Sequence, residues 1–130
     1  MRPSASSCAS AGLRSRRRAF ELTDDCLFCT LFREGDHIAT APGLVAIRDI
    51  NPQAATHVLV IPERHIDTFR DIAVFSADED KRMLDFVAEV AAQEGLSDYR
   101  VVVNVGAGGG QTIFHLHWHV LGGGLTGRMT

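Results

Sequence analysis

The chain has 130 residues and a mass of 14.1 kDa, which corresponds to about one domain. Hydrophobic residues make up 45% and charged residues 22%, so the chain can bury a core, and a disordered or collagen-like protein is excluded. No apolar run approaches the roughly 18 residues of a membrane-spanning helix, so we expect no membrane partner. Three cysteines are too few for a disulfide-stabilised secreted scaffold.

Charge is unevenly distributed along the chain, although the formal net charge is only −3. Residues 1–20 carry five arginines and no acid, whereas the other eight basic residues face all sixteen acids, a net charge of −8 for residues 21–130. An acidic body repels a phosphate backbone, so nucleic acid is not an expected partner. Small phosphate ligands remain possible, because backbone N–H groups bind them without net positive charge.

Residues 1–20 lack any hydrophobic period and form a basic N-terminal extension, which we interpret as flexible. Their composition also resembles a transit peptide, and a start codon placed too far upstream is a further alternative. A secretory signal is not expected, because these residues contain no apolar segment of the kind that such signals carry. The domain therefore covers residues 21–130. We expect a cytoplasmic protein, because a C-x-x-C pair indicates metal or redox chemistry in a reducing compartment and the arginine-rich composition suits a bacterial cytoplasmic protein.

Within the domain, hydrophobic patterns and turn signals predict two helices and four strands in chain order. A helix capped by Asp24 or Asp25 is expected first, and a glycine-rich turn separates the last two strands. Short connections favour an antiparallel arrangement, so the predicted fold class is α+β, with a mainly antiparallel sheet of about five strands, one long helix and one or two short helices. The predicted elements are helix Cys26–Arg33, strands Leu44–Arg48 and His57–Ile61, helix Ala77–Glu94, strand Arg100–Val105, turn Gly106–Gly110 and strand Ile113–Leu121.

The strongest helix signal covers Ala77–Glu94. Ser76 and Glu79 have the spacing of a capping box, and Gly95 suits the position just after the helix. An apolar stripe at helical spacing predicts the buried face of this helix. The stripe consists of Met83, Leu84, Val87, Val90 and Ala91.

Three histidines alternate with apolar residues near the C-terminus. In a strand, His115, His117 and His119 share one face, whereas Leu116, Trp118 and Val120 share the other. Each buried imidazole needs partners and resists charging, so three on one face indicate a metal site, nucleophilic catalysis, or both. We expect Trp118 to pack beneath the sheet, away from these histidines.

Just upstream, the glycine-rich turn Gly106–Gly110 can bring bare backbone N–H groups close to an anion. Gln111 and the Thr112 hydroxyl add further donors. Such turns are common in ordinary hairpins, but beside three histidines this segment predicts a phosphate cradle.

Cys26 and Cys29 form a C-x-x-C pair that has three interpretations. Such a pair supplies two of the four ligands of a tetrahedral zinc site. A redox pair is a second interpretation, disfavoured because no thioredoxin-like βαβ pattern surrounds it, and two ordinary reduced cysteines are the third. Cys8 is expected to be an idle thiol.

The run from His115 to Leu121 resembles the His-x-His-x-His signature of the histidine-triad superfamily of nucleotide hydrolases and transferases. Further segments agree in order over roughly residues 22–124, and the nearest branch is the histidine-triad nucleotide-binding proteins, which cleave the P–N bond of nucleoside phosphoramidates. The matching segments are Asp49–Ala54, Thr56–Pro62 with His65, Arg100–Asn104 and Gly110–Thr112.

The resemblance implies a role for each matching residue. His117 would attack the α-phosphorus and form a covalent nucleotidyl-histidine, whereas His119 would bond the phosphoryl oxygens or assist the leaving group, and His57 would support the histidine network. Water would then release a nucleoside monophosphate such as AMP. The implied nucleotide-binding residues are Asp49 for the ribose, Ile50 for the base, and Asn104, Gly110, Gln111 and Thr112 for the phosphate. For Asp49, a turn-capping role is the alternative.

The resemblance also implies a ligand set for zinc: Cys26, Cys29, His65 and His115. One zinc per chain would be structural, since four protein ligands leave no open position. The implied partners are purine nucleoside monophosphate derivatives and a second copy of the chain, which would form a homodimer with an extended sheet. The family often follows its triad with Leu-Gly-Gly-Arg and ends with Trp-Pro-Pro-Gly. Neither motif is present in this chain, which ends with Gly122–Thr130.

Three alternative functions remain open from the sequence. A dinucleoside-polyphosphate hydrolase would use the same His117 nucleophile with a phosphate leaving group. A nucleotide-binding regulatory module would have vestigial catalysis. A structural protein with several histidine-bound zinc ions is the third.

Overall fold

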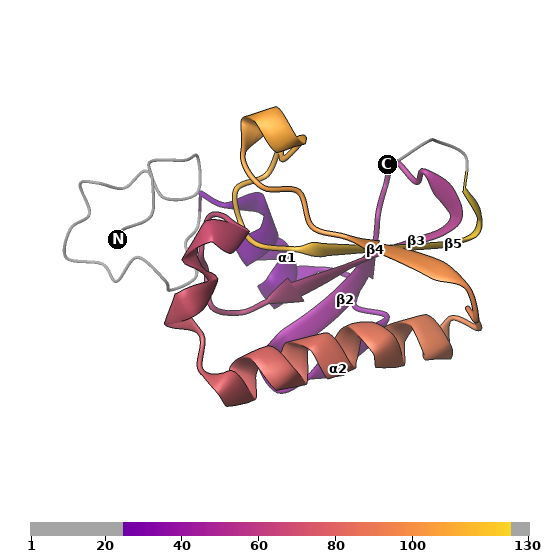
Figure 1. Cartoon of the computed structure of the whole chain (residues 1–130), viewed down its shortest axis with the longest axis horizontal. Coiled ribbons are helices and arrows are strands. Elements are labelled where there is room, and N and C mark those ends of the chain that lie inside the picture. The colour runs from indigo at the N-terminus through magenta and orange to yellow at the C-terminus, as the bar shows by residue number, and fades with distance from the viewer. Residues whose placement is uncertain (1–24, 126–130) are drawn as a thin grey trace.

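A computed structural model describes residues 25–125, so the predictions for residues 1–20 and for Asp24 lie outside the described residues. Its five strands form one antiparallel sheet in the order β1-β2-β3-β5-β4, and the long helix α2 runs along one side (Figure 1). This α+β architecture confirms the predicted fold class. In chain order the elements are α1 (Leu27–Glu34), β1 (Ala39–Ala41), β2 (Leu44–Arg48), β3 (Ala54–Pro62), the 3-10 segment η1 (Phe69–Val74), α2 (Ala77–Gln93), β4 (Tyr99–Val102), the 3-10 segment η2 (Ala107–Gly109) and β5 (Trp118–Leu125).

The sheet is buried on both faces at its centre. Val58 and Val60 of β3 pack in the cluster formed with α2, whereas the alternate residues Leu59 and Ile61 pack in a second cluster with α1. A strand that is covered on both faces needs apolar residues at every position. This explains the uninterrupted apolar run that the sequence shows in β3.

Helix α2 begins as the sequence predicts. The Ser76 hydroxyl accepts a hydrogen bond from the Glu79 N–H at 3.1 Å, and Glu79 accepts one from the Ser76 N–H at 2.8 Å, which confirms the capping box. Gly95 follows the helix with φ of +78°, a conformation that favours glycine. The predicted stripe was wrong at Leu84, which is 52% exposed, because Phe86 faces the sheet instead.

Helix α1 starts at a different cap from the one predicted. The N-cap is Cys26, whose sulfur accepts a hydrogen bond from the Cys29 N–H at 3.4 Å. Asp25 is exposed and precedes this cap. The cysteine side chain therefore both starts the helix and faces the buried histidines described below.

The strands differ from the prediction mainly at their ends. β5 begins at Trp118 rather than at Ile113, so His115 and His117 precede the strand. The physical reason is that β3 ends at Pro62, which has no N–H, and the Pro62 carbonyl instead accepts from the His115 ring at 2.8 Å. β4 likewise ends at Val102 rather than at residue 105.

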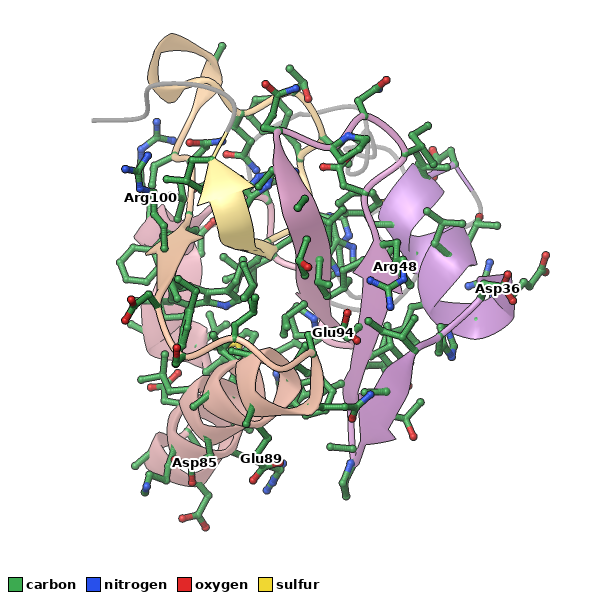
Figure 2. All side chains as sticks on the ribbon, turned by 90° about the vertical axis from the view of Figure 1, so that its right-hand side faces the viewer. Asp36, Arg48, Asp85, Glu89, Glu94 and Arg100 are labelled. Atoms are coloured by element: carbon green, nitrogen blue, oxygen red, sulfur yellow. The ribbon has the colours of Figure 1, made fainter. Side chains whose placement is uncertain are left out.

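Two elements escaped the prediction, the short strand β1 and the 3-10 segment η1. On the α2 side of the sheet, Arg48 on β2 forms a double hydrogen bond with Glu94 at the end of α2, with a closest distance of 2.8 Å (Figure 2). This contact links β2 to the C-terminal end of α2.

Within residues 25–125, no helix is long and apolar enough to cross a bilayer.

Candidate active site and metal centre

The three triad histidines lie on the sheet side opposite α2, although only His119 belongs to a strand. Leu116 and Trp118 lie in the α2 cluster, whereas the ring of His117 packs against Phe28 of α1. Alternation therefore persists through an irregular segment. Trp118 packs beneath the sheet as predicted, in an edge-to-face contact with Phe69 at 6.0 Å between ring centroids.

His117 is held in an orientation suited to nucleophilic attack. Its Nδ1–H donates to the His115 carbonyl at 2.8 Å, so the neutral ring carries its lone pair on Nε2. The residue is 8% exposed, and this burial lowers its pKa, against the opposing effect of the hydrogen bond. The Phe28 ring meets it edge-on at 4.8 Å and 85°. The ring is therefore neutral near pH 7.

His119 and His57 form a second pair beside His117. His57 Nε2 lies 2.9 Å from His119 Nδ1 and 3.3 Å from Asp49 Oδ2. Burial lowers the pKa of His57, with a smaller opposing effect of Asp49. Burial, together with the neighbouring His117 and His57, lowers the pKa of His119 to about 4. The rings of His57, His117 and His119 are thus all neutral near pH 7 in the absence of ligand.

The side chain of Gln111 holds the glycine-rich segment in place. Its Oε1 accepts from the Gly106 N–H at 2.9 Å, and its Nε2 donates to the carbonyls of Asp67 at 2.7 Å and Ile113 at 3.0 Å. Both amide protons are thus engaged within the protein.

The other residues predicted for nucleotide binding are less enclosed. Gly110 has φ of +94°, and a Cβ added to it would lie 3.7 Å from the side chain of Asn104. Thr112 is exposed, and Ile50 is 91% exposed. The Asp49 Oδ1 accepts from the Asn51 N–H at 2.8 Å, which is the turn-capping contact considered for this residue.

The four predicted metal ligands converge in one buried cluster of two sulfurs and two ring nitrogens. His65 Nδ1 lies 3.1 Å from His115 Nδ1, and the nitrogen–sulfur distances are 3.3, 3.4 and 3.6 Å. Tetrahedral zinc ligands are expected about 3.3 Å apart for two nitrogens and about 3.5 Å apart for nitrogen and sulfur. The donor set and spacing of Cys26, Cys29, His65 and His115 therefore fit zinc.

The outer nitrogens of both histidines in this cluster have partners of their own. His65 Nε2 lies 3.0 Å from Asp67 Oδ1, and His115 Nε2 donates to the Pro62 carbonyl. Burial would lower the pKa of His65, but hydrogen bonds to Asp67 and Cys29 raise it to about 9, whereas burial and the nearby His65 lower the pKa of His115 to about 3. Such partners fix the ring so that Nδ1 faces a metal.

Cys26 is disulfide-bonded in the structure, whereas Cys29 is free. Only a thiolate binds zinc, so Cys26 can join the cluster as a ligand in its reduced form. Asp67 and Phe28 are site residues that the sequence analysis missed. The His-x-Asp spacing of His65 and Asp67 is the signal that could have indicated the first, whereas the contact of Phe28 with His117 spans 89 residues and has no local signal.

The sequence model of the HIT domain family matches residues 33–124, and the chain belongs to this family. Among its relatives, the Escherichia coli K12 protein "Purine nucleoside phosphoramidase" is 41% identical over 88 residues, which cover 66% of this chain and 74% of that protein. Protein HitA of Neisseria gonorrhoeae is 34% identical over 110 residues, which cover 76% and 96% of the two chains. These likenesses support a hydrolase at the level of the family.

Solved structures agree in fold. A HIT family hydrolase from Legionella pneumophila superposes with a TM-score of 0.67 at 39% identity, covering 81% of this chain and 96% of that one. A zinc-bound histidine triad family protein from Mycobacterium smegmatis gives a TM-score of 0.63 at 27% identity, covering 74% and 73%.

Proposed function

We propose that this protein hydrolyses nucleoside 5′-phosphoramidates, with AMP derivatives preferred, through a covalent intermediate on His117. The observation that carries the proposal is the hydrogen bond from His117 Nδ1–H to the His115 carbonyl, at 2.8 Å. It leaves Nε2 as an unprotonated nucleophile in a ring whose pKa is lowered by burial. The similarity to a purine nucleoside phosphoramidase favours a P–N bond as the one that is cleaved.

In the proposed reaction, the Nε2 lone pair of His117 attacks the α-phosphorus. A P–N bond forms to the imidazole and the bond to the substrate's amine breaks, so the amine leaves with a proton taken from solvent, which the attacking water returns in the second step. Water then attacks the same phosphorus, releases the nucleoside monophosphate and returns neutral His117. His119 lies beside this ring, with 5.0 Å between ring centroids, where it can hydrogen-bond a phosphoryl oxygen.

For the nucleotide itself, we assign the phosphate to Asn104, Gly110 and Thr112, with Gln111 holding the loop that carries them. The loop's backbone N–H groups supply donors of the kind that bind phosphate. Asp49 and Ile50 keep the roles of ribose and base contacts. Because Ile50 is so exposed, a bound base would bury it.

We assign one structural zinc per chain to Cys26, Cys29, His65 and His115. Zinc would supply a cross-link between the start of α1, the segment after β3 and the segment before β5. Because α1 carries Phe28 against His117, this cross-link would hold one wall of the active site. Zinc binding requires Cys26 in its reduced form, so this assignment goes together with the proposed location in the reducing cytoplasm.

We further propose a homodimer in which the sheets of two protomers join at β4. This strand is at the end of the sheet, and its residues Tyr99 and Val101 are both exposed. An unpaired edge with apolar residues is a surface that a second copy can extend. Light scattering of the purified protein measures this state directly.

The decisive experiment is mass spectrometry of protein quenched during turnover of an adenosine phosphoramidate. We expect an added adenylyl group on His117, and its absence during active turnover would refute the covalent step. His117→Ala should abolish turnover and keep AMP binding, whereas the matched variant His37→Ala, a histidine bound to the Leu31 carbonyl, should keep both. Unchanged turnover in His117→Ala would remove this mechanism.

The same assay separates the alternative functions. A phosphoramidase releases an amine and AMP, whereas a dinucleoside-polyphosphate hydrolase releases AMP and a second nucleotide. Binding of AMP without turnover of either substrate would leave a regulatory module.

A further inference from the structure

Asp49, His57 and His119 form a cluster whose ligand atoms lie within 4.8 Å of one another. Two histidines and one carboxylate can hold a transition metal. They can equally form a chain of hydrogen bonds. The position of the proton on His57 distinguishes these two possibilities.

A backbone group fixes that proton. The Gln53 N–H donates to His57 Nδ1 at 3.0 Å, so Nδ1 carries no hydrogen. A neutral imidazole has a single N–H, which must then be on Nε2. A metal bound at Nε2 would leave His57 without a ring proton, as an imidazolate. The geometry therefore favours a hydrogen-bond chain over a metal site.

The direction of this chain extends to His119. His57 Nε2–H lies 2.9 Å from His119 Nδ1, so Nδ1 accepts and the single proton of neutral His119 is on Nε2. Asp49 Oδ2, at 3.3 Å from His57 Nε2, attracts the same proton of His57. His57 and His119 thus each have one assigned tautomer, with the hydrogen on Nε2.

The chain ends at a donor that nothing in the described part of the protein satisfies. His119 Nε2 is buried and has no hydrogen-bond partner among these residues. A buried, unpaired donor costs about 1–3 kcal/mol, and such groups are retained where a ligand completes them. The open donor lies on the histidine next to the proposed nucleophile.

We propose that the Gln53 backbone N–H and the Asp49 carboxylate are positioning groups, which fix the tautomers of His57 and His119 so that His119 offers Nε2–H to an oxygen of the substrate's α-phosphate. The inference rests on the proposed function for the identity of the ligand. It gives Asp49 a role in addition to the ribose contact. His119 acts as a donor that keeps its proton, since losing it from a neutral ring would leave an imidazolate.

The first test measures the tautomers without any substrate. Long-range proton–nitrogen NMR of the histidine side chains, at a pH well above 6.5, reports which ring nitrogen carries the hydrogen. We expect Nε2–H on His57 and His119, and the opposite tautomer, Nδ1–H, on His117 as an internal reference. An Nδ1–H signal on either His57 or His119 would overturn the proposal.

The second test changes the positioning groups. Gln53→Pro removes the backbone N–H, whereas Gln53→Ala retains it, so only the proline variant should lose the assigned tautomers. Asp49→Asn keeps an acceptor for the Asn51 N–H but replaces the charge beside His57. It should lower kcat about tenfold, a fraction of the loss expected on removing one transition-state donor.

Substrate analogues separate positioning from ribose binding. If Asp49 serves only the ribose, Asp49→Asn raises KM, and the effect disappears with a 2′,3′-dideoxy substrate; this result would contradict the proposal. If Asp49 positions His119, the loss in kcat persists with both substrates. Should the wild-type protein turn over no phosphoramidate, the proposed function fails, while the NMR result still decides the tautomers.

Discussion

His65 Nε2 lies 3.0 Å from Asp67 Oδ1, and both side chains are completely buried. The two residues are separated by a single position in the chain, so the carboxylate can orient the ring whose other nitrogen faces the cysteines. This pair combines a proposed metal ligand with a supporting acid. It indicates that the proposed zinc site extends beyond its four ligands.

Asp67→Asn should lower zinc affinity by about 10–100-fold, the usual cost of removing a group that orients a metal-bound histidine. An amide at this position cannot match the carboxylate as an acceptor for the His65 Nε2–H. Competition with a chromogenic chelator measures the affinity. Asp36→Asn, at an exposed position, is the matched control and should leave it unchanged. Equal affinities in both variants would contradict the role of Asp67.

Cys29→Ser should remove zinc from the reduced protein and lower its Tm by about 10 °C, because a loss of roughly 2 kcal/mol shifts a small domain by about 4–8 °C per kcal/mol. The thiolate is lost, and a serine hydroxyl is a poor zinc ligand. Metal analysis and calorimetry in the presence of a reductant measure both effects. A chelator should lower the Tm of the wild-type protein and not that of the variant, and a chelator-insensitive wild type would contradict a structural metal.

The pH profile of kcat/KM should have its acid limb below pH 6.5, the ordinary pKa of histidine. His117 attacks only when unprotonated, and burial lowers its pKa, so the active form persists as the pH falls through 6.5 and is lost only at lower pH. Steady-state measurements of kcat/KM over a range of pH, in well-buffered solutions, give the position of the acid limb.

Phe28→Ala tests the cause of this shift. Removing the ring that packs on His117 lets water reach the imidazole, so its pKa and the acid limb should rise toward 6.5. Phe32→Ala, which changes a partly buried phenylalanine of the same helix that packs near His37, is the control. An acid limb that stays in place in Phe28→Ala would show that burial by this ring is not the cause.

Gln111→Glu should raise KM for the nucleotide about tenfold or more and lower the stability by about 1–3 kcal/mol. The substitution keeps the shape of the side chain but places a carboxylate oxygen against the carbonyls of Asp67 and Ile113, which then lose their donor. Urea unfolding and steady-state kinetics measure the two effects. Gln93→Glu, the same change at an exposed position, should leave KM unchanged; equal effects in the two variants would refute the role of Gln111 in the loop.

The sequence by itself predicted the features that depend on short spacings. The capping box of Ser76 and Glu79 needs only a helix turn, and α2 begins where it predicts. The alternation of His115, His117 and His119 with apolar neighbours placed the histidines opposite the α2 core even though the segment before Trp118 is not a strand. Burial on one side decided this result, because apolar residues at every second position pack into the same core in either conformation.

Only the tertiary structure decided how the histidines are used. The start of β5 depends on Pro62, and the tautomers of His57 and His119 depend on the Gln53 backbone and on a ring 62 residues away. Hydrogen-bond direction is fixed by the partner of each nitrogen, and that partner is brought near by strand pairing rather than by sequence neighbours. A list of histidines therefore predicts a reactive face, whereas the fold decides which ring nitrogen of His117 and His119 carries the hydrogen and places His115 beside Cys29 and His65.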